Sequence, residues 1–364
     1  MILIDLQKAF DCVDHALLVR KLAAMGVAST DWFHSYLNDR SQCTQVKSID
    51  SSFLNVNCGV PQGSILGPTL FLCYINDMAE ALSCRLSLYA DDSALLHSGP
   101  DPKLVADFLS SQLSICHSWL IDNRLSLHLG KTECILFGPK RRLKRVTDFT
   151  VKLGNAEVNR VTSVKYLGVF LDQHMNFSTH VENVLSKARS KLAFLYRNRG
   201  FLNYRTRKLL CQSLIFSCIE YCSSSWYPGL LMGLRDSIDV FQRKSARFVL
   251  DHSPRSHIAN ADYGFLSWLP FPKRVSYFNL IHLFKVRTGL SPSYLANGFT
   301  DVSAVHGYNL RQCEINFSLA RCFLPVGTFQ RTVIQEWNAL PLYLKEIRSL
   351  SNFKSRLKCY LQSA

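Results

Sequence analysis

Three aspartates stand where their carboxylates could share a cation. Asp91 and Asp92 are adjacent inside the strand-like stretch LSLYADDSALL, and Asp5 ends the apolar run MILID. Two neighbouring carboxylates at a tight turn repel each other unless a cation lies between them. If the two segments pair in one sheet, the three side chains meet at one edge, and such oxygen ligands suit Mg²⁺. A plain pair of turn acids would also explain Asp91 and Asp92.

The elements that would position these acids alternate between strands and helices. Apolar runs predict a buried strand over Ile2–Leu6, a strand–turn–strand hairpin over 86–96 and a strand over 131–137. Asp14 is placed to cap a helix, and the Gly- and Pro-containing loop 59–67 leads into a further apolar helix. This order predicts an α+β fold rather than a doubly wound sheet.

Beyond Phe137 the pattern becomes basic and then helical. The connector GPKRRLKR is followed by short strand-like stretches, and Thr179 with Glu182 predicts a capping box at the start of a long helix. Later helices are expected over Arg205–Tyr221, Ser237–Leu250 and Lys273–Arg287.

The charge is unevenly spread along the 364 residues. The net charge is +15, yet residues 1–137 hold 9 Lys and Arg against 14 Asp and Glu, which leaves 33 against 13 for residues 138–364. An acidic first part and a strongly basic remainder suggest a cation-binding centre beside a surface that holds a polyanion. Two ordinary solvated surfaces are the simpler explanation.

The spacing of the cysteines and the length of the apolar runs indicate where the protein is found. The thirteen cysteines contain no Cys-x-x-Cys pair, so we do not expect a zinc site. We expect instead that the cysteines are reduced core thiols of an intracellular protein. The opening residues do not resemble a secretory signal, and the longest apolar run is shorter than the ~20 residues of a membrane span. We therefore expect a protein of the nucleus or cytoplasm that is neither secreted nor membrane-bound.

Five stretches together resemble a known series of motifs. LIDLQKAFDCVDH, GVPQGSILGPTLF, LYADDSALL, NRLSLHLGKTECILF and VKYLGVFLD stand in the order and rough spacing of motifs A to E of reverse transcriptases. The sequence is most similar to those of non-LTR, LINE-type retrotransposons, and the resemblance extends over essentially the whole chain. The occurrence of all five motifs together is highly specific for this family.

The resemblance implies an α+β palm, an antiparallel sheet packed on helices, followed by a mainly helical thumb and C-terminal region. The implied boundaries are 1–137 for the palm with motifs A to D, 138–177 for the palm end and a hairpin matching motif E, 178–255 for the thumb, and 256–364 for the C-terminal region. Basic thumb helices would follow the phosphates of a template–primer duplex.

The resemblance also implies roles for individual residues of this chain. The resemblance implies that Asp5 and Asp91, with Asp92 beside them, hold two Mg²⁺ ions (Mn²⁺ is a possible substitute) for nucleotidyl transfer onto a primer 3′-hydroxyl. Lys131 matches the lysine of motif D, which would protonate or neutralise the leaving pyrophosphate. His128 stands where the family usually has asparagine, so the local turn there is open to question.

Other matched residues would contact the substrates. Phe10 matches the aromatic gate that excludes a 2′-hydroxyl, although a core aromatic would look the same. Gln62 and Gly63 match residues that contact the template and the incoming nucleotide. The remaining matches form the primer grip, Tyr166, Leu167 and Gly168, which an ordinary hairpin would also explain. The implied partners are an RNA template, a DNA primer and dNTPs.

The sequence begins four residues before Asp5, whereas the family carries a fingers region upstream. We therefore expect an N-terminally truncated polymerase whose primer extension is very weak unless another chain supplies fingers. A catalytically inactive, nucleic-acid-binding relic is the alternative. A two-metal nuclease would use the same acids but leaves Phe10 and the Gln62 loop unexplained.

Overall fold

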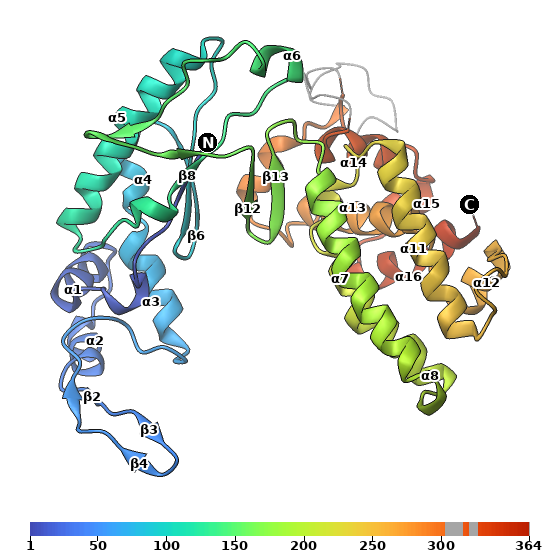
Figure 1. Cartoon of the computed structure of the whole chain (residues 1–364), viewed down its shortest axis with the longest axis horizontal. Coiled ribbons are helices and arrows are strands. Elements are labelled where there is room, and N and C mark those ends of the chain that lie inside the picture. The colour runs from blue at the N-terminus through green and yellow to red at the C-terminus, as the bar shows by residue number, and fades with distance from the viewer. Residues whose placement is uncertain (303–315, 320–326, 364) are drawn as a thin grey trace. The chain divides into compact units, whose positions relative to one another are not determined.

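The computed structural model describes residues 1–302, 316–319 and 327–363, which fold as two compact units, Met1–His174 and Met175–Ala364 (Figure 1). The first unit mixes strands and helices, and the second is helical. The predicted mixture of helices and antiparallel strands is thereby confirmed, while the finer division into four regions stays a prediction. In the described part of the chain, no helix is both long and apolar enough to cross a bilayer.

A five-stranded sheet forms the centre of the first unit. Its strand order is β11-β8-β1-β7-β6, and every pair is antiparallel except β11 with β8. Strand β1 therefore lies in the middle, next to one arm of the hairpin that carries the paired acids. The strand bounds are β1 Ile2–Ile4, β6 Arg85–Tyr89, β7 Asp92–Leu96, β8 Glu133–Cys134 and β11 Asn159–Arg160.

Alternating side chains give this sheet two covered faces. Ile2, Ile4 and Leu95 are buried against the helices, whereas Leu3 and Ala94 point to the opposite face. The helices on the first face are α1 His15–Ala24, α3 Leu66–Ile75 and α5 Pro102–Asp122. The opposite face packs against the hairpin of β12 Ser163–Tyr166 and β13 Val169–Asp172. Both faces of the sheet therefore carry apolar side chains, which the helices cover on one face and the hairpin covers on the other.

Local signals in the sequence set several helix boundaries. The Asp14 side chain accepts a hydrogen bond from the backbone N–H of Leu17 and caps α1, as predicted. Helix α7, Ser178–Arg197, was expected to begin with a capping box of Thr179 and Glu182, and this prediction is wrong. The helix starts one residue earlier, and the Asn176 side chain accepts from the backbone N–H of Ser178, so the first turn does not need the Thr179 hydroxyl.

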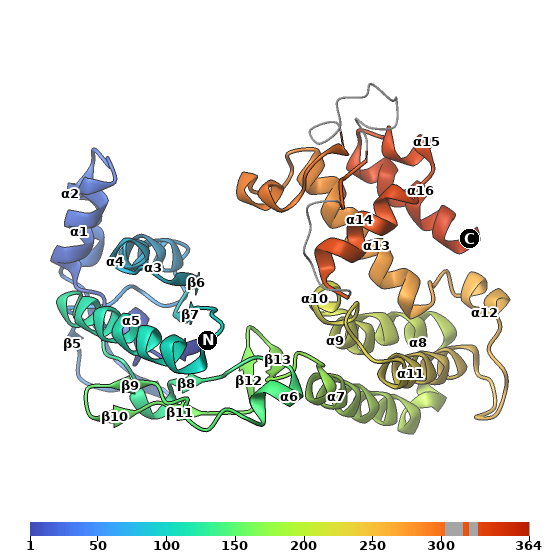
Figure 2. The ribbon, with the colours of Figure 1, turned by 90° about the horizontal axis from the view of Figure 1, so that it is seen from above.

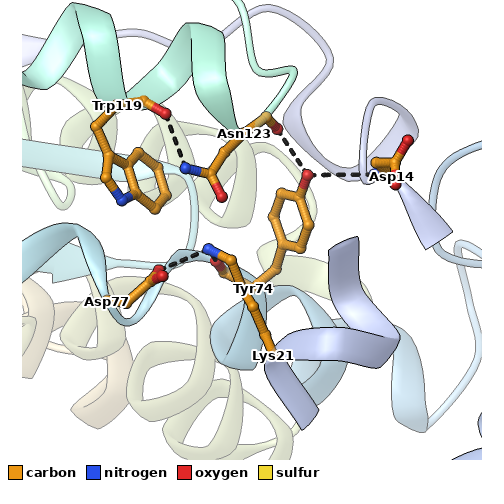
Figure 3. A network of polar contacts seen from close by, with 6 residues as sticks. All are labelled: Asp14, Lys21, Tyr74, Asp77, Trp119 and Asn123. Carbon is orange, nitrogen blue, oxygen red and sulfur yellow. Dashed lines mark hydrogen bonds and ion pairs between the residues drawn. The ribbon is translucent and has the colours of Figure 1, made fainter. Parts of the chain in front are cut away.

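A buried polar network joins the three helices behind the sheet (Figure 3). Lys21 of α1 donates to the backbone oxygen of Tyr74 at 2.7 Å and to Asp77 at 2.6 Å. The Tyr74 hydroxyl donates to the backbone oxygen of Asn123 at 2.6 Å and accepts from the backbone N–H of Asp14 at 3.4 Å. Because the network joins groups of α1, α3 and the end of α5, it fixes the start of α1 relative to the other two helices.

Smaller elements complete the first unit. The segment β9–β11 runs alongside α5, where the Ser110 hydroxyl accepts from the backbone N–H of Lys152 at 2.9 Å (Figure 2). An arm of four short strands extends away from the sheet beyond α2 (Figure 1). The bounds are α2 Thr30–Leu37, β2 Ser41–Gln42, β3 Gln45–Val46, β4 Ile49–Asp50, β5 Leu54–Asn55, α4 Met78–Ala81, α6 Lys140–Leu143, β9 Lys152–Leu153 and β10 Ala156–Glu157.

The second unit consists of helices around apolar cores. The helix predicted over Arg205–Tyr221 exists, but its middle, Cys211–Phe216, is a π-helical turn. Helices α13, α14 and α16 share a core that includes Phe284, Trp337 and Phe353. The bounds are α8 Tyr204–Leu210, α9 Ser217–Glu220, α10 Ser223–Trp226, α11 Met232–Leu250, α12 Asn260–Phe265, α13 Phe271–Arg287, α14 Phe329–Asn338, α15 Leu342–Lys345 and α16 Leu350–Ser363.

The cysteines are not gathered in one environment. Cys116, Cys134 and Cys211 are buried, as expected of core thiols, whereas Cys58 and Cys222 are exposed. Cys313 and Cys322 lie outside the described residues.

Candidate functional site

The pairing of β1 with β7 brings the aspartates to one edge of the sheet. Ile4 pairs with Ser93, Asp5 directly follows Ile4, and Asp92 directly precedes Ser93. In an antiparallel ladder, the next position along one strand faces the preceding position of the other, so Asp5 and Asp92 face each other. The predicted meeting of the two segments in one sheet is confirmed.

A two-residue turn holds the paired acids. Tyr89 pairs with Asp92, which leaves Ala90 and Asp91 as the turn between β6 and β7. Ala90 has φ of 53°, a left-handed conformation that a small side chain tolerates better than a bulky one. The turn exposes both carboxylates at the tip of the hairpin.

The three carboxylates influence one another electrostatically. The pKa of Asp92 is raised by partial burial, and then by the negative charges of Asp91 and Asp5. This repulsion is what a bound cation would relieve, and an all-carboxylate donor set matches the preference of Mg²⁺. The donor chemistry therefore fits a divalent cation. As the side chains stand, however, no three His, Cys, Asp or Glu residues within the described ranges are grouped closely enough to hold one ion.

Lys131 joins the same edge through the segment that follows α5. The backbone N–H of His128 donates to the backbone oxygen of Asp5 at 2.8 Å, and that of Gln7 donates to Ser126 at 2.9 Å. Lys131 Nζ consequently lies 4.0 Å from Asp5 Oδ2, beside a cleft of about 450 Å³. His128 precedes a short 3-10 helix, Leu129–Lys131, and its backbone oxygen, not its side chain, accepts the hydrogen bond from the Lys131 backbone N–H.

Phe10 lies on a 3-10 turn just beyond Asp5. Its ring stacks on Phe71 of α3, with centroids 4.3 Å apart and planes inclined by 24°. The backbone N–H of Val60 donates to the Phe10 carbonyl at 2.8 Å, which ties this turn to the Gly- and Pro-containing loop. Phe10 is half-buried, so one part of the ring belongs to the core and another part reaches solvent.

The loop with Gln62 and Gly63 is fastened to the same turn. Gln62 Nε2 donates to Asp11 Oδ1 at 2.7 Å, and Gly63 has φ of +81°. A Cβ on Gly59, which has φ of +89°, would lie 2.9 Å from the Asp11 backbone, so only glycine permits this approach. Nothing in the sequence predicts the bond between Asp11 and Gln62, because the two residues are distant in the chain.

Tyr166, Leu167 and Gly168 form the tip of the β12–β13 hairpin. Tyr166 pairs with Val169, and the two turn residues have φ of 45° and 82°, the positive values typical of a tight type I′ turn. The Tyr166 hydroxyl lies 2.8 Å from the Ser87 hydroxyl on β6. This hydrogen bond ties the hairpin tip to the strand that leads into Asp91 and Asp92.

The predicted residues thus fall into three connected groups. Carboxylate interactions and an ion pair join Asp5, Asp91, Asp92 and Lys131, whereas backbone and side-chain hydrogen bonds join the Phe10 turn to the Gln62 loop. The hairpin of Tyr166 is joined to β6. The chain itself links the first two groups, since only four residues separate Asp5 from Phe10.

Comparison with known proteins agrees with this arrangement. Residues 1–171 match the family described as reverse transcriptase (RNA-dependent DNA polymerase). These residues belong to the reverse transcriptase family. The reverse transcriptase domain contains all five predicted motifs, and it ends within β13.

Curated relatives of this reverse transcriptase domain come from mobile elements. The chain is 27% identical over 255 residues to a probable RNA-directed DNA polymerase from transposon X-element of Drosophila melanogaster, which covers 68% of the chain and 28% of that relative. The chain is also 26% identical over 230 residues to the RNA-directed DNA polymerase from mobile element jockey of the same species. This match covers 60% of the chain and 25% of that relative. The predicted resemblance to retrotransposon reverse transcriptases is confirmed.

A third relative is shorter. The chain is 26% identical over 225 residues to a Pol polyprotein from type-1 retrotransposable element R1 of Nasonia vitripennis, covering 58% of the chain and 65% of the relative. By contrast, the chain spans less than a third of the length of the first four relatives, at 22% to 29%.

Proposed function

We propose that the chain is the polymerase part of a LINE-type reverse transcriptase, which copies an RNA template by adding dNTPs to the 3′-hydroxyl of a DNA primer. Residues 1–177 would form the palm with its primer grip, residues 178–255 the basic helical thumb, and residues 256–364 a helical C-terminal region. The observation that carries the proposal is the register that pairs Ile4 of β1 with Ser93 of β7 and so brings Asp5, which follows β1, toward Asp92 at the start of β7.

The acids would serve as metal ligands in this reaction. Asp5, Asp91 and Asp92 would hold two Mg²⁺ ions, which when bound supply charge neutralisation for the transferred phosphoryl group. The chain contributes the ligands at the adjoining ends of two paired strands, where burial, and then the charges of Asp91 and Asp5, raise the pKa of Asp92. The three side chains would have to draw closer together to share an ion, because they are not grouped closely enough as they stand.

Lys131 would act on the leaving group. Its ammonium lies 4.0 Å from Asp5 Oδ2 and is 67% exposed, so it is near the acids yet free to reach a solvent-facing phosphate. A cation here can neutralise or protonate the leaving pyrophosphate without disturbing the three carboxylates.

Phe10 and the Gln62 loop would select the substrate. Phe10 is anchored by its stacking on Phe71, and a fixed ring edge can exclude a 2′-hydroxyl by contact alone. Asp11 accepts from the Gln62 amide nitrogen, so Gln62 keeps its amide oxygen available as an acceptor. Tyr166, Leu167 and Gly168 would press on the primer backbone from the hairpin tied to β6.

A primer-extension assay on an RNA template tests this function. We expect Mg²⁺-dependent synthesis that Asp91→Asn abolishes and that Asp77→Asn, a change at a partly exposed acid paired with Lys21 behind the sheet, does not affect beyond its effect on folding. The chain should be assayed alone and preceded by the matching upstream region of a relative, because it spans under a third of those proteins. Synthesis that survives replacement of Asp5 and Asp91 together would refute the assignment.

We do not favour the inactive relic. The acids, Lys131, the Phe10 turn and the Gln62 loop all take up connected positions in one unit, and the relatives carry the name of polymerases. A nuclease would leave the bond between Asp11 and Gln62 without a role.

A further inference from the structure

Three flat side chains are stacked in series on the outside of α2. The rings of Trp32 and Tyr36 are parallel within 6°, with centroids 5.4 Å apart. The guanidinium of Arg40 lies over the Tyr36 ring at 5.4 Å, and its Nη1 donates to the Tyr36 carbonyl at 3.3 Å. Trp32 and Tyr36 stand four residues apart on α2 and so share one face of the helix, whereas Arg40 follows the end of the helix. We call these three residues the stacking ladder.

The packing of α2 leaves this ladder at the surface. Leu37 is 1% exposed and Phe33 is partly buried, and both pack into the core of the unit. Trp32 is 54% exposed, although indole is among the most apolar side chains. The core therefore holds the helix through Phe33 and Leu37, and the Trp32 ring is presented to solvent, supported by Tyr36.

The ladder is continuous with the loop proposed to contact the template. Arg40, Lys8 and Gln62 line one cleft of about 790 Å³. The other lining residues are mixed: Leu37, Val56, Val60 and Pro61 are apolar, whereas the polar ones are Asp11, Ser41, Gln42, Asn55 and Asn57. Arg40, Lys8 and the amide side chains can donate hydrogen bonds to a nucleic-acid backbone.

We infer that the stacking ladder binds single-stranded nucleic acid, namely the unpaired part of the template adjoining Gln62. Bases stack on exposed aromatic rings whatever their sequence, and a stacked guanidinium can also contact a phosphate. Trp32 would receive one base on its open face, while Arg40 guides the backbone into the cleft. The direction in which the strand runs rests on the proposed function. The binding of single-stranded nucleic acid to the ladder does not depend on that function.

Binding is measured with a fluorescently labelled 12-residue oligo(U) in EDTA, by anisotropy at fixed salt. Trp32→Leu keeps apolar bulk but removes the ring, and should weaken binding about 5- to 100-fold. Trp32→Phe should keep binding within about threefold, because a ring remains. Arg40→Ala should weaken binding and lower the salt slope by about one. Circular dichroism and thermal unfolding establish that each variant folds.

A control variant distinguishes base stacking from nonspecific binding to an apolar surface. Ile49 on β4 is 75% exposed and apolar but has no ring, so Ile49→Ala should leave binding unchanged. Equal losses from Ile49→Ala and Trp32→Leu would show an unspecific apolar surface and overturn the inference. Unchanged binding by Trp32→Leu would do the same, and would point to a protein partner for this surface.

A second comparison distinguishes this inference from the proposed function. Primed templates with two or with ten unpaired template nucleotides are bound in EDTA, and Trp32→Leu should weaken binding only to the longer overhang. Equal weakening for both would remove the ladder from the template path. Absence of primer extension together with Trp32-dependent oligo(U) binding would reject the polymerase proposal and keep the ladder.

Discussion

Lys131 Nζ lies 4.0 Å from Asp5 Oδ2, although the two residues belong to motifs D and A, which are far apart in the chain. Their approach follows from the hydrogen bond between the backbone N–H of His128 and the carbonyl of Asp5, which fixes the segment before the lysine. Both side chains are substantially exposed, at 67% and 43%, so the pair contributes only about 0–1 kcal/mol to stability.

Replacement of Lys131 should act on turnover. Lys131→Ala is expected to lower kcat about 10- to 100-fold with KM for dNTP within about twofold, because the charge assists only the departing pyrophosphate. Lys131→Arg, which keeps the charge but cannot give up a proton, separates neutralisation from protonation. Single-turnover extension across a pH series provides the measurement. A changed KM with unchanged kcat would instead make Lys131 a binding residue.

Asp92→Asn should stabilise the metal-free protein. The folded-state pKa of Asp92 is raised, so its ionised form opposes folding once the pH exceeds the ordinary pKa of the acid. The variant should therefore melt above the parent at pH 7 in EDTA, and the difference should shrink as the pH falls toward that pKa. Added Mg²⁺ should raise the Tm of the parent more than that of Asp92→Asn.

Asp107→Asn is the matched control for this experiment. Asp107 lies on α5, outside the cluster, and its replacement should alter neither the pH dependence nor the Mg²⁺ response. Asp92→Asn that melts below the parent at pH 7 in EDTA would contradict the reported repulsion.

Phe10→Ala should relax the choice of sugar. The ring is half-buried and fixed against Phe71, so its removal opens space beside the acids while leaving their strands intact. Ribonucleotide insertion should rise relative to deoxyribonucleotide insertion, as measured by kcat/KM for a matched pair. Phe71→Leu removes the stacking partner from the core and should cost about 1 kcal/mol of stability. If sugar selection stays the same in Phe10→Ala, the ring serves the core only.

The Tyr74 hydroxyl should stabilise the fold up to high pH. Tyr74→Phe removes the hydrogen bonds to Asn123 and Asp14, and is expected to cost about 1–2 kcal/mol in urea unfolding at pH 7. Burial raises the pKa of Tyr74 to about 12, so ionisation opposes folding above pH 10. The advantage of the parent should therefore diminish between pH 10 and 12. A constant difference over that range would show that Tyr74 ionises normally in the fold.

Basic side chains of α7 should set part of the salt dependence. Lys187 and Arg189 are exposed, and each phosphate contact contributes about 0.9 to the slope of log K against log salt on B-form DNA. The double variant to alanine should bind an RNA–DNA hybrid with a slope smaller by about one to two. Ser186→Ala on the same helix serves as the uncharged control. An unchanged slope would show that this part of α7 does not meet the duplex.

Local signals in the sequence were sufficient for several elements of the first unit. Alternating or continuous apolar runs predicted β1 and the β6–β7 hairpin, and Asp14 predicted the start of α1, because these signals depend on neighbours along the chain. Helix α2 and the arm of β2–β5 were not predicted. The start of α7 was misplaced, since the helix begins at Ser178, before Thr179, and residue spacing alone does not decide where a first turn begins.

The residue types of the candidate site were determined by the sequence, and their meeting was decided only by tertiary structure. The motif series named Asp5, Asp92 and Lys131, but their proximity depends on the pairing of β1 with β7 and on the His128 hydrogen bond. The partnership of Asp11 with Gln62 and the exposure of Trp32 left no sign in the sequence. Local propensity acts over a few residues, whereas contacts between distant segments arise only when the whole chain packs around its core.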